Sequence, residues 1–167
     1  VATILKFTIN FAIKHKLKLK IAARNSFKNF SAERNFYEKY LNNIEYNYLV
    51  KNIIYRSDKY NTYIGMEKSK VVIGTMSTML RENLAINGKT LACNFMKTNI
   101  FDFPIKGICF FNESNYIKFE KRLKNILQIS QHNYKKLLKK NISYIVHKEK
   151  NLNTIDQIKF KLKLFLK

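Results

Sequence analysis

The sequence predicts an α/β fold with an open, doubly wound parallel sheet. Short apolar runs of strand length alternate with stretches of helical period at least three times before residue 96. Strands separated by helices pair in parallel through right-handed crossovers, so we expect helices on both faces of one sheet. With 167 residues, of which 46% are hydrophobic, the chain is long enough for one domain with its own core.

The first part of the chain is expected to begin with a helix over 1–15 and a strand over 17–24. Apolar residues three and four apart predict the helix, and alternation of apolar with basic residues predicts the strand. A second helix is expected to begin at Ser31, followed by a second strand over 48–55 and a short helix around Tyr63.

The third strand, over 70–74, is a continuous apolar run of the kind expected for a central strand covered on both faces. A helix over 77–87 follows it. Gly88 stands where a left-handed residue often ends a helix, and the next parallel strand is expected over 89–95.

The last third of the chain is expected to contain a long connection and then three helices, beginning near Ser114, Ser130 and Thr154. The sequence therefore divides into an α/β core over 1–112 and C-terminal helices over 113–167. We expect these helices to pack on the core as part of the same domain.

The net charge of +21 has two possible origins. A charge of this size attracts nucleic acids and acidic membrane surfaces. However, the chain contains 27 Lys, 20 Asn and 20 Ile, all encoded by A/T-rich codons, and only five Arg. Arginine is more typical of specific phosphate and base recognition. A bias in genome composition therefore explains the same charge without a polyanionic partner.

The cysteines and histidines predict neither a metal site nor a disulfide framework. Cys93 and Cys109 have no metal-binding spacing, and the three histidines share no spacing and are expected at the surface. Unpaired cysteines favour a reducing cytosol. No apolar run reaches the length of a membrane span. The start at Val1 suggests a processed chain or a fragment of a longer one.

The turn over 74–78 is the strongest candidate binding site. In open α/β sheets, ligands bind outside the carboxyl ends of the strands. Gly74 permits close approach, while the hydroxyls of Ser77 and Thr78 and the first N–H groups of the helix suit a phosphate. Simple capping of the helix explains the same hydroxyls. The sequence has neither a Walker nor a G-x-G-x-x-G pattern.

Two charged residues are candidates to complete this site. Glu82 lies one helical turn beyond Thr78 and could accept hydrogen bonds from sugar hydroxyls, or it could be solvated or pair with Arg81. Arg24 ends the first strand and could bind a phosphate or carboxylate, or pair with Glu33. No nucleophile–base pair is evident, so hydrolase chemistry is not predicted.

The segment VVIGTMSTMLRENLAINGKTLACNF, residues 71–95, resembles the nucleotide-sugar half of GT-B glycosyltransferases. The closest likeness is to bacterial surface-carbohydrate transferases with a pattern of the type V-V-(I/V)-G-x-x-S-T-x-x-R-E-x-L. The resemblance extends over most of the chain but is specific only over 71–110. It implies a Rossmann-like fold, namely the C-terminal, donor-binding lobe of a GT-B architecture.

The resemblance also implies roles for the candidate residues. The donor would be a nucleotide-sugar, with no further cofactor and no bound metal, because the helix dipole and basic groups stabilise the leaving phosphate. Arg24 would lie on the rim of the cleft and Glu82 would contact the ribose or sugar. The residues implied for the donor phosphate are those of the turn: Gly74, Thr75, Ser77 and Thr78.

A GT-B enzyme has two lobes, and the acceptor and usually the catalytic base belong to the N-terminal one. With only one lobe, the chain is expected to be part of a longer enzyme, to work with a partner chain that supplies the other lobe, or to have kept this lobe for binding alone. No catalytic residue is assigned. The implied acceptor is a glycan or lipid-linked sugar for surface polysaccharide. A cytoplasmic location is expected, where the basic surface could hold the chain near acidic lipid on the inner face of the membrane. The alternative is a non-enzymatic, basic RNA- or ribosome-associated domain.

Overall fold

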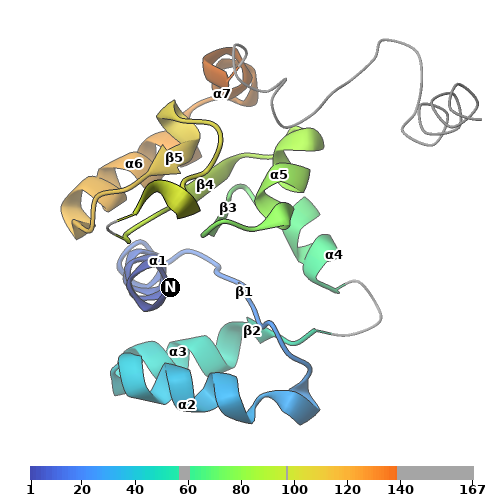
Figure 1. Ribbon diagram of the computed structural model, residues 1–167, viewed down its shortest axis with the longest axis vertical. Helices are drawn as coiled ribbons and strands as arrows, with labels where there is room; N and C mark the ends of the chain where they lie inside the picture. Colours follow the sequence, from blue (N-terminus) through green and yellow to red (C-terminus); the bar gives the residue numbers. More distant parts are fainter. Residues whose placement is uncertain (57–60, 97, 139–167) are drawn as a thin grey trace, which may run out of the picture.

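The computed structural model describes residues 1–56, 61–96 and 98–138 (Figure 1). The helix expected from Thr154 and the predicted surface residue His147 lie outside them. The described α-helices are α1 (Ala2–Lys14), α2 (Ser31–Tyr40), α3 (Asn43–Asn52), α4 (Asn61–Glu67), α5 (Thr78–Ala85), α6 (Tyr116–Gln128) and α7 (Gln131–Leu138). The strands are β1 (Ile21–Ala22), β2 (Ile53–Ile54), β3 (Val72–Gly74), β4 (Thr90–Cys93) and β5 (Phe110–Phe111). Three short 3₁₀ turns are η1 (Phe27–Asn29), η2 (Asn99–Phe101) and η3 (Gly107–Cys109).

In the described residues the strands form two small sheets, not the single doubly wound sheet that the sequence predicted. All pairings are parallel, so the parallel α/β architecture is confirmed. β1 pairs with β2, and β3, β4 and β5 form a separate three-stranded sheet in that order. The central strand is therefore β4, which is completely buried, whereas β3 is a half-exposed edge strand.

The predicted strand over 48–55 is wrong for most of its length, because α3 continues to Asn52. A reciprocal capping box begins this helix: the Asn42 side chain accepts a hydrogen bond from Glu45 N (2.9 Å), and the Glu45 carboxylate accepts one from Asn42 N (3.0 Å). Asn and Glu three residues apart were the sequence signal for this helix. Only Ile53 and Ile54 remain to pair with β1.

Helix α1 lies between the two sheets and contributes to two hydrophobic cores (Figure 1). Ile4 and Phe11 belong to the larger core, which includes β4, β5, α5, α6 and α7. Ile9 belongs to the smaller core, with residues of β1, α2 and α3. Such a helix buries apolar residues on more than one side, so the cores share one wall.

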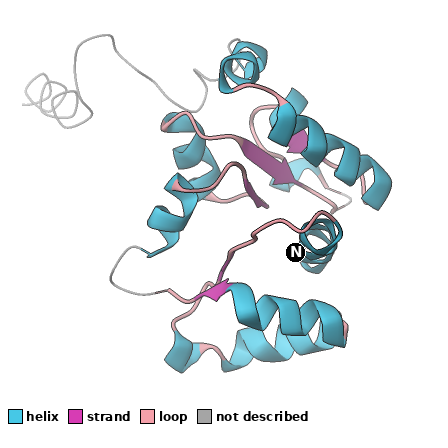
Figure 2. Cartoon of the chain, turned by 180° about the vertical axis from the view of Figure 1, so that it is seen from behind, coloured by secondary structure: helices cyan, strands magenta, loops and turns pink. Residues whose placement is uncertain are grey.

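The larger core is a layered arrangement around the three-stranded sheet. Viewed from behind, the sheet lies between helices, with α5 on one side and α6 on the other (Figure 2). Leu80 and Leu84 of α5 and Phe119 and Leu123 of α6 are almost completely buried there. Both helices were predicted from the spacing of these apolar residues.

The turn from α5 into β4 is fixed by the buried side chain of Asn83. Its amide donates hydrogen bonds to Lys89 O (2.7 Å) and Thr90 Oγ1 (2.9 Å). A Cβ at Gly88 would lie 2.1 Å from Asn83 Oδ1, so this close approach requires a glycine. The left-handed residue is Asn87, with φ of 67°, and not Gly88 as the sequence predicted.

Tyr134 of α7 supplies hydrogen bonds to the part of β4 that lies beyond the end of the short strand β5. β5 pairs only with Ala92 and Cys93. At Thr90, the buried Tyr134 hydroxyl accepts from the backbone N–H (3.0 Å) and donates to the backbone carbonyl (2.6 Å). One side chain thus replaces two hydrogen bonds of the missing strand.

We expect Tyr134→Phe to lower the free energy of unfolding by about 1–3 kcal/mol, because it leaves buried backbone groups of Thr90 unpaired. Urea denaturation measures this change. Tyr46→Phe is the matched control, since the Tyr46 hydroxyl donates to Glu38 at an exposed position. Equal losses in the two variants would contradict this role for Tyr134.

The contact between α1 and α6 is held by the buried carboxylate of Glu120. It accepts hydrogen bonds from Lys14 Nζ (2.9 Å), His15 Nε2 (2.7 Å) and Lys124 Nζ (3.1 Å). Hydrogen bonds from Lys14 first, then from His15 and Lys124, lower the pKa of Glu120 to about 2. His15, predicted as a surface residue, is therefore half-buried in this cluster, whereas His132 is exposed as predicted.

We expect the stabilisation by Glu120 to disappear in acid. The pKa of Glu120 falls from an ordinary value of 4.5 to about 2 on folding, so the folded state binds this proton less readily than the unfolded chain. The contribution of Glu120 to the free energy of unfolding is complete above the ordinary pKa and is lost as the pH falls towards the pKa of the folded state. The difference in Tm between the wild type and Glu120→Gln should be largest at neutral pH and vanish near the folded pKa. Glu113→Gln, at an exposed pair with Lys118, should show little difference at any pH.

Candidate functional site at the carboxyl edge of the three-stranded sheet

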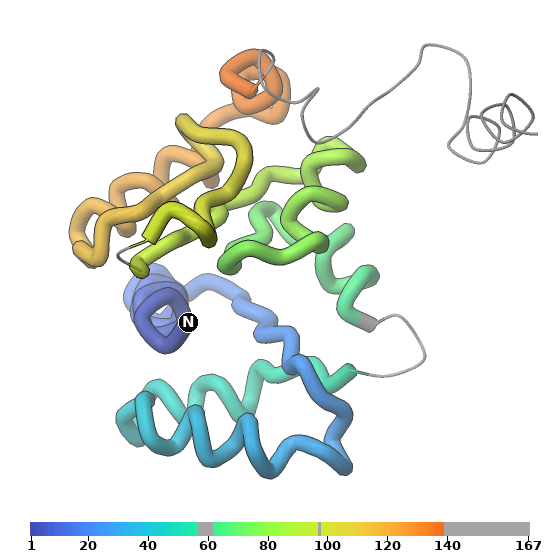
Figure 3. Tube along the Cα trace, in the orientation of Figure 1, coloured from blue at the N-terminus to red at the C-terminus, as the bar shows by residue number. Residues whose placement is uncertain are grey.

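Three chain segments leave the same edge of the three-stranded sheet. Gly74 of β3 is paired with Ala92 of β4, and Cys93 with Phe111 of β5, so the parallel strands end side by side. The turn into α5 and the loop after β4 lie on the side of the sheet nearer α1 (Figure 3). This edge is the place where open α/β sheets bind ligands.

Ser77 is the N-cap of α5. Its backbone is extended, and its Oγ accepts a hydrogen bond from Met79 N at 3.3 Å. The capping interpretation is thus confirmed, and α5 begins at Thr78, which is exposed. Thr75 is half-buried within the turn. Capping and phosphate binding use the same end of the helix, so a role in phosphate binding stays a prediction.

Packing does not require a glycine at position 74. A Cβ there would lie 3.7 Å from the side chain of Leu80, which is an ordinary van der Waals distance, and the backbone of Gly74 is not left-handed. Gly88, at the other end of α5, is required by its contact with Asn83. Gly74 instead leaves the end of β3 without a side chain at the candidate site.

Glu82 carries an unsatisfied polar atom. Its Oε2 is buried and has no hydrogen-bond partner within the described ranges. The neighbouring Arg81 is exposed, and no described ion pair involves either residue. A buried carboxylate oxygen without a partner is unfavourable and rare in folded proteins. Glu82 lies one helical turn from Thr78, so a ligand at the start of α5 could supply the missing donor.

Arg24 follows β1, and β1 belongs to the other sheet. Arg24 and the turn over 74–78 therefore do not share a sheet edge. The Glu33 carboxylate accepts hydrogen bonds from the backbone N–H groups of Arg24 (2.9 Å) and Asn25 (3.0 Å), not from the Arg24 guanidinium. The Arg24 side chain is exposed, and its place on a cleft rim stays a prediction.

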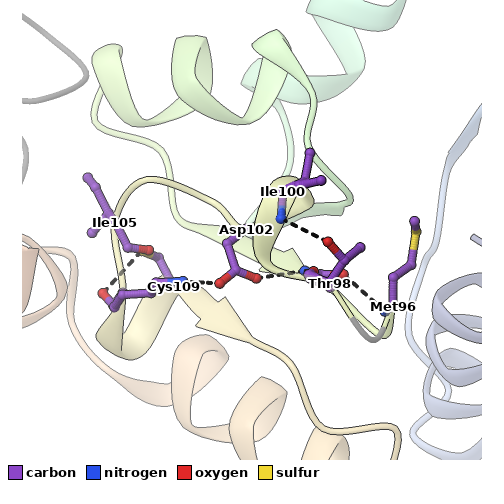
Figure 4. Close-up of polar contacts among 8 residues, drawn as sticks. Met96, Thr98, Ile100, Asp102, Ile105 and Cys109 are labelled. Carbon is purple, nitrogen blue, oxygen red and sulfur yellow. Dashed lines mark hydrogen bonds and ion pairs between the residues drawn. The ribbon is translucent and has the colours of Figure 1, made fainter.

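The loop after β4 is organised by Asn94, which sequence reasoning missed. The buried Asn94 amide donates to Thr98 O (2.8 Å) and Asp102 Oδ1 (2.6 Å), and its Oδ1 accepts from Met96 N (3.0 Å) (Figure 4). Lys106 also donates to Asp102, and this hydrogen bond, followed by that from Asn94, lowers the pKa of Asp102. Polar contacts thus fix the segment that leaves the central strand.

The described residues contain no group of three or more His, Cys, Asp or Glu side chains suited to a metal ion. Burial raises the pKa of Cys93 and of Cys109 to about 12, so both thiols stay protonated and unreactive at neutral pH. Among the helices of the described ranges, none has the length and hydrophobicity needed to cross a bilayer.

A protein-family model described as "putative O-antigen biosynthesis protein" matches residues 2–162 of the chain. The match includes both sheets, both cores and the candidate turn. No curated protein and no solved structure matches the chain.

Proposed function

Because the chain belongs to this family of O-antigen biosynthesis proteins, we propose that it binds a nucleotide-sugar as the donor lobe of a GT-B-type glycosyltransferase. Membership of the family associates the chain with the biosynthesis of surface carbohydrate. The donor site of the proposal is the carboxyl edge of the three-stranded sheet, at the start of α5.

The buried, unpartnered Oε2 of Glu82 is the observation that carries the proposal. A ribose or sugar hydroxyl is a neutral donor that can satisfy a carboxylate without bringing in a second charge. One helical turn away, the start of α5 favours an anion because its N–H groups and the helix dipole are directed there. Gly74 leaves room for such a ligand. A diphosphate joined to sugars has both kinds of group at adjacent positions.

In the proposed reaction, an acceptor hydroxyl attacks the anomeric carbon of the donor sugar. The bond from this carbon to the phosphate oxygen breaks, and its electron pair stays with the departing nucleotide. Thr75, Ser77, Thr78 and the start of α5 stabilise the negative charge on that phosphate. The acceptor, a glycan or a lipid-linked sugar, and the base that takes its proton belong to a second lobe or a partner chain. The proposal places this reaction on the cytoplasmic side of the membrane.

We expect one of CMP, CDP, UDP and GDP to raise the Tm at both low and moderate salt, because a ligand that binds only the folded state stabilises it. Ser77→Ala should lower the affinity for that nucleotide about tenfold or more, which is the effect of losing one hydrogen bond to a charged group. Thermal-shift titration measures both effects.

Asn115→Ala is the matched control for Ser77→Ala. Asn115 caps α6 by accepting from Lys118 N at 3.0 Å, so both variants lose an N-cap worth about 1 kcal/mol. Only Ser77→Ala should lower the affinity for the nucleotide. If single-stranded RNA alone stabilises the protein, and only at low salt, Ser77 is simply a cap and the RNA-associated alternative is favoured.

We expect Glu82→Gln to weaken binding of the matching nucleotide-sugar about tenfold, because a neutral amide is a poorer acceptor for sugar hydroxyls than a carboxylate. The Tm without ligand should stay the same or rise, since the change removes an unpaired charge. Isothermal titration calorimetry gives the affinity, and Glu67→Gln, at an exposed position on α4, is the control. Unchanged affinity in Glu82→Gln would exclude Glu82 from the site.

A further inference from the structure

An apolar hollow of about 350 Å³ lies between the end of α1 and α3. Ile44 is 71% exposed and Ile13 is 37% exposed. On α3, the lining residues recur three and four positions apart and so form one stripe along the helix. The residues that line the hollow are Ile13, Ile44, Asn47, Tyr48 and Lys51.

Basic residues border this hollow. The Tyr48 hydroxyl donates to Leu17 O at 3.1 Å, so the segment after α1 runs alongside the stripe on α3. Leu17 is itself 41% exposed and lies between the exposed residues Lys16 and Lys18. Neither of these lysines, nor Lys51 in the hollow, forms an ion pair with a described acid.

The two acids buried beside this face, Glu45 and Glu120, do not neutralise these lysines. No acid precedes Glu33 in the sequence. Glu45 of α3 is buried, where it caps its own helix and accepts a hydrogen bond from Asn10 at 3.0 Å. Glu120, which contacts the end of α1, is buried and engaged by Lys14, His15 and Lys124. The surface is therefore apolar at its centre and positive around it.

We propose that this α1–α3 face, formed by Ile13, Lys16, Leu17, Lys18, Ile44 and Lys51, docks on an anionic phospholipid bilayer. Exposed isoleucine and leucine side chains enter the interfacial layer, and the lysines contact headgroup phosphates. Binding at such an interface combines buried apolar area with attraction to anionic lipids. The exposed apolar side chains of Ile13, Leu17 and Ile44 within the basic surface distinguish this partner from RNA, which would contact the lysines and leave Ile44 in water.

The docking face does not rest on the proposed donor site. It is built from α1, the segment after it and α3, whereas the donor site is built from the turn between β3 and α5. In Figure 1, α3 and the three-stranded sheet lie on opposite sides of α1. Failure of one proposal therefore leaves the other intact.

The test is co-sedimentation of the full chain with vesicles of phosphatidylcholine alone and of equimolar phosphatidylcholine and phosphatidylglycerol. We expect binding only to the anionic vesicles. Neutralising the three lysines of the α1–α3 face in K16Q/K18Q/K51Q should weaken vesicle binding at least tenfold, because each lysine near an anionic surface contributes about fivefold to the affinity. K121Q/K135Q/K136Q removes the same charge from exposed positions on α6 and α7 and should bind nearly as well as the wild type.

The apolar contribution has its own pair of variants. Ile44→Asn should weaken vesicle binding several-fold, whereas Ile117→Asn, at a position that is 76% exposed on α6, should not. Equal losses in the two triple variants would show attraction by net charge alone and overturn the proposal. Absence of binding to anionic vesicles, or binding indifferent to Ile44→Asn, would overturn it as well. Circular dichroism verifies that each variant is folded.

Discussion

The burial of α1 between two cores is the constraint on which the rest of the structure depends. A pair of two-residue strands cannot be stable by itself, so β1 and β2 depend on the helices around them. Ile9 provides part of that support, while Ile4 and Phe11 of the same helix close the larger core. The Glu120 cluster then fixes the end of α1 against α6. A shift of α1 along its axis would disturb both cores together.

This constraint extends to the carboxyl edge of the three-stranded sheet. The ring centroid of Phe7 on α1 lies 5.6 Å from that of Phe95, just after β4, and 5.5 Å from that of Phe119 on α6. Aromatic contacts of this kind stabilise beyond the area they bury. Together with the hydrogen bonds of Asn94, they hold the end of the central strand on a rigid support. Binding sites need such support from residues that do not themselves touch the ligand.

The sequence predicted local features well and long-range pairing poorly. Helices α1 and α6 follow from clear apolar spacing, and the order β3, α5, β4 follows from strand and turn signals between 70 and 95. The prediction of a strand over 48–55 was wrong because a short apolar run fits either a helix or a strand. The division into two sheets could not be predicted, since strand pairing is decided by distant segments. Likewise, the turn at Ser77 was found from sequence, but the burial of Glu82 Oε2 and the anchoring role of Asn94 exist only in the folded chain.

The two explanations of the net charge are compatible once the acids are considered. Compositional bias would place lysines throughout the chain, and several of them have structural roles. Lys14 and Lys124 form ion pairs with Glu120. Lys89 donates a hydrogen bond to Ile126 O (2.9 Å) near the end of α6, where the helix dipole favours a positive charge. Acids are few, only 11 in the whole sequence. Several of them, such as Glu33, Glu45 and Glu120, are engaged in internal contacts. The position of the acids, more than that of the lysines, therefore decides where positive potential remains. Beside the α1–α3 face, Glu45 and Glu120 are buried, and the positive surface coincides with exposed apolar side chains.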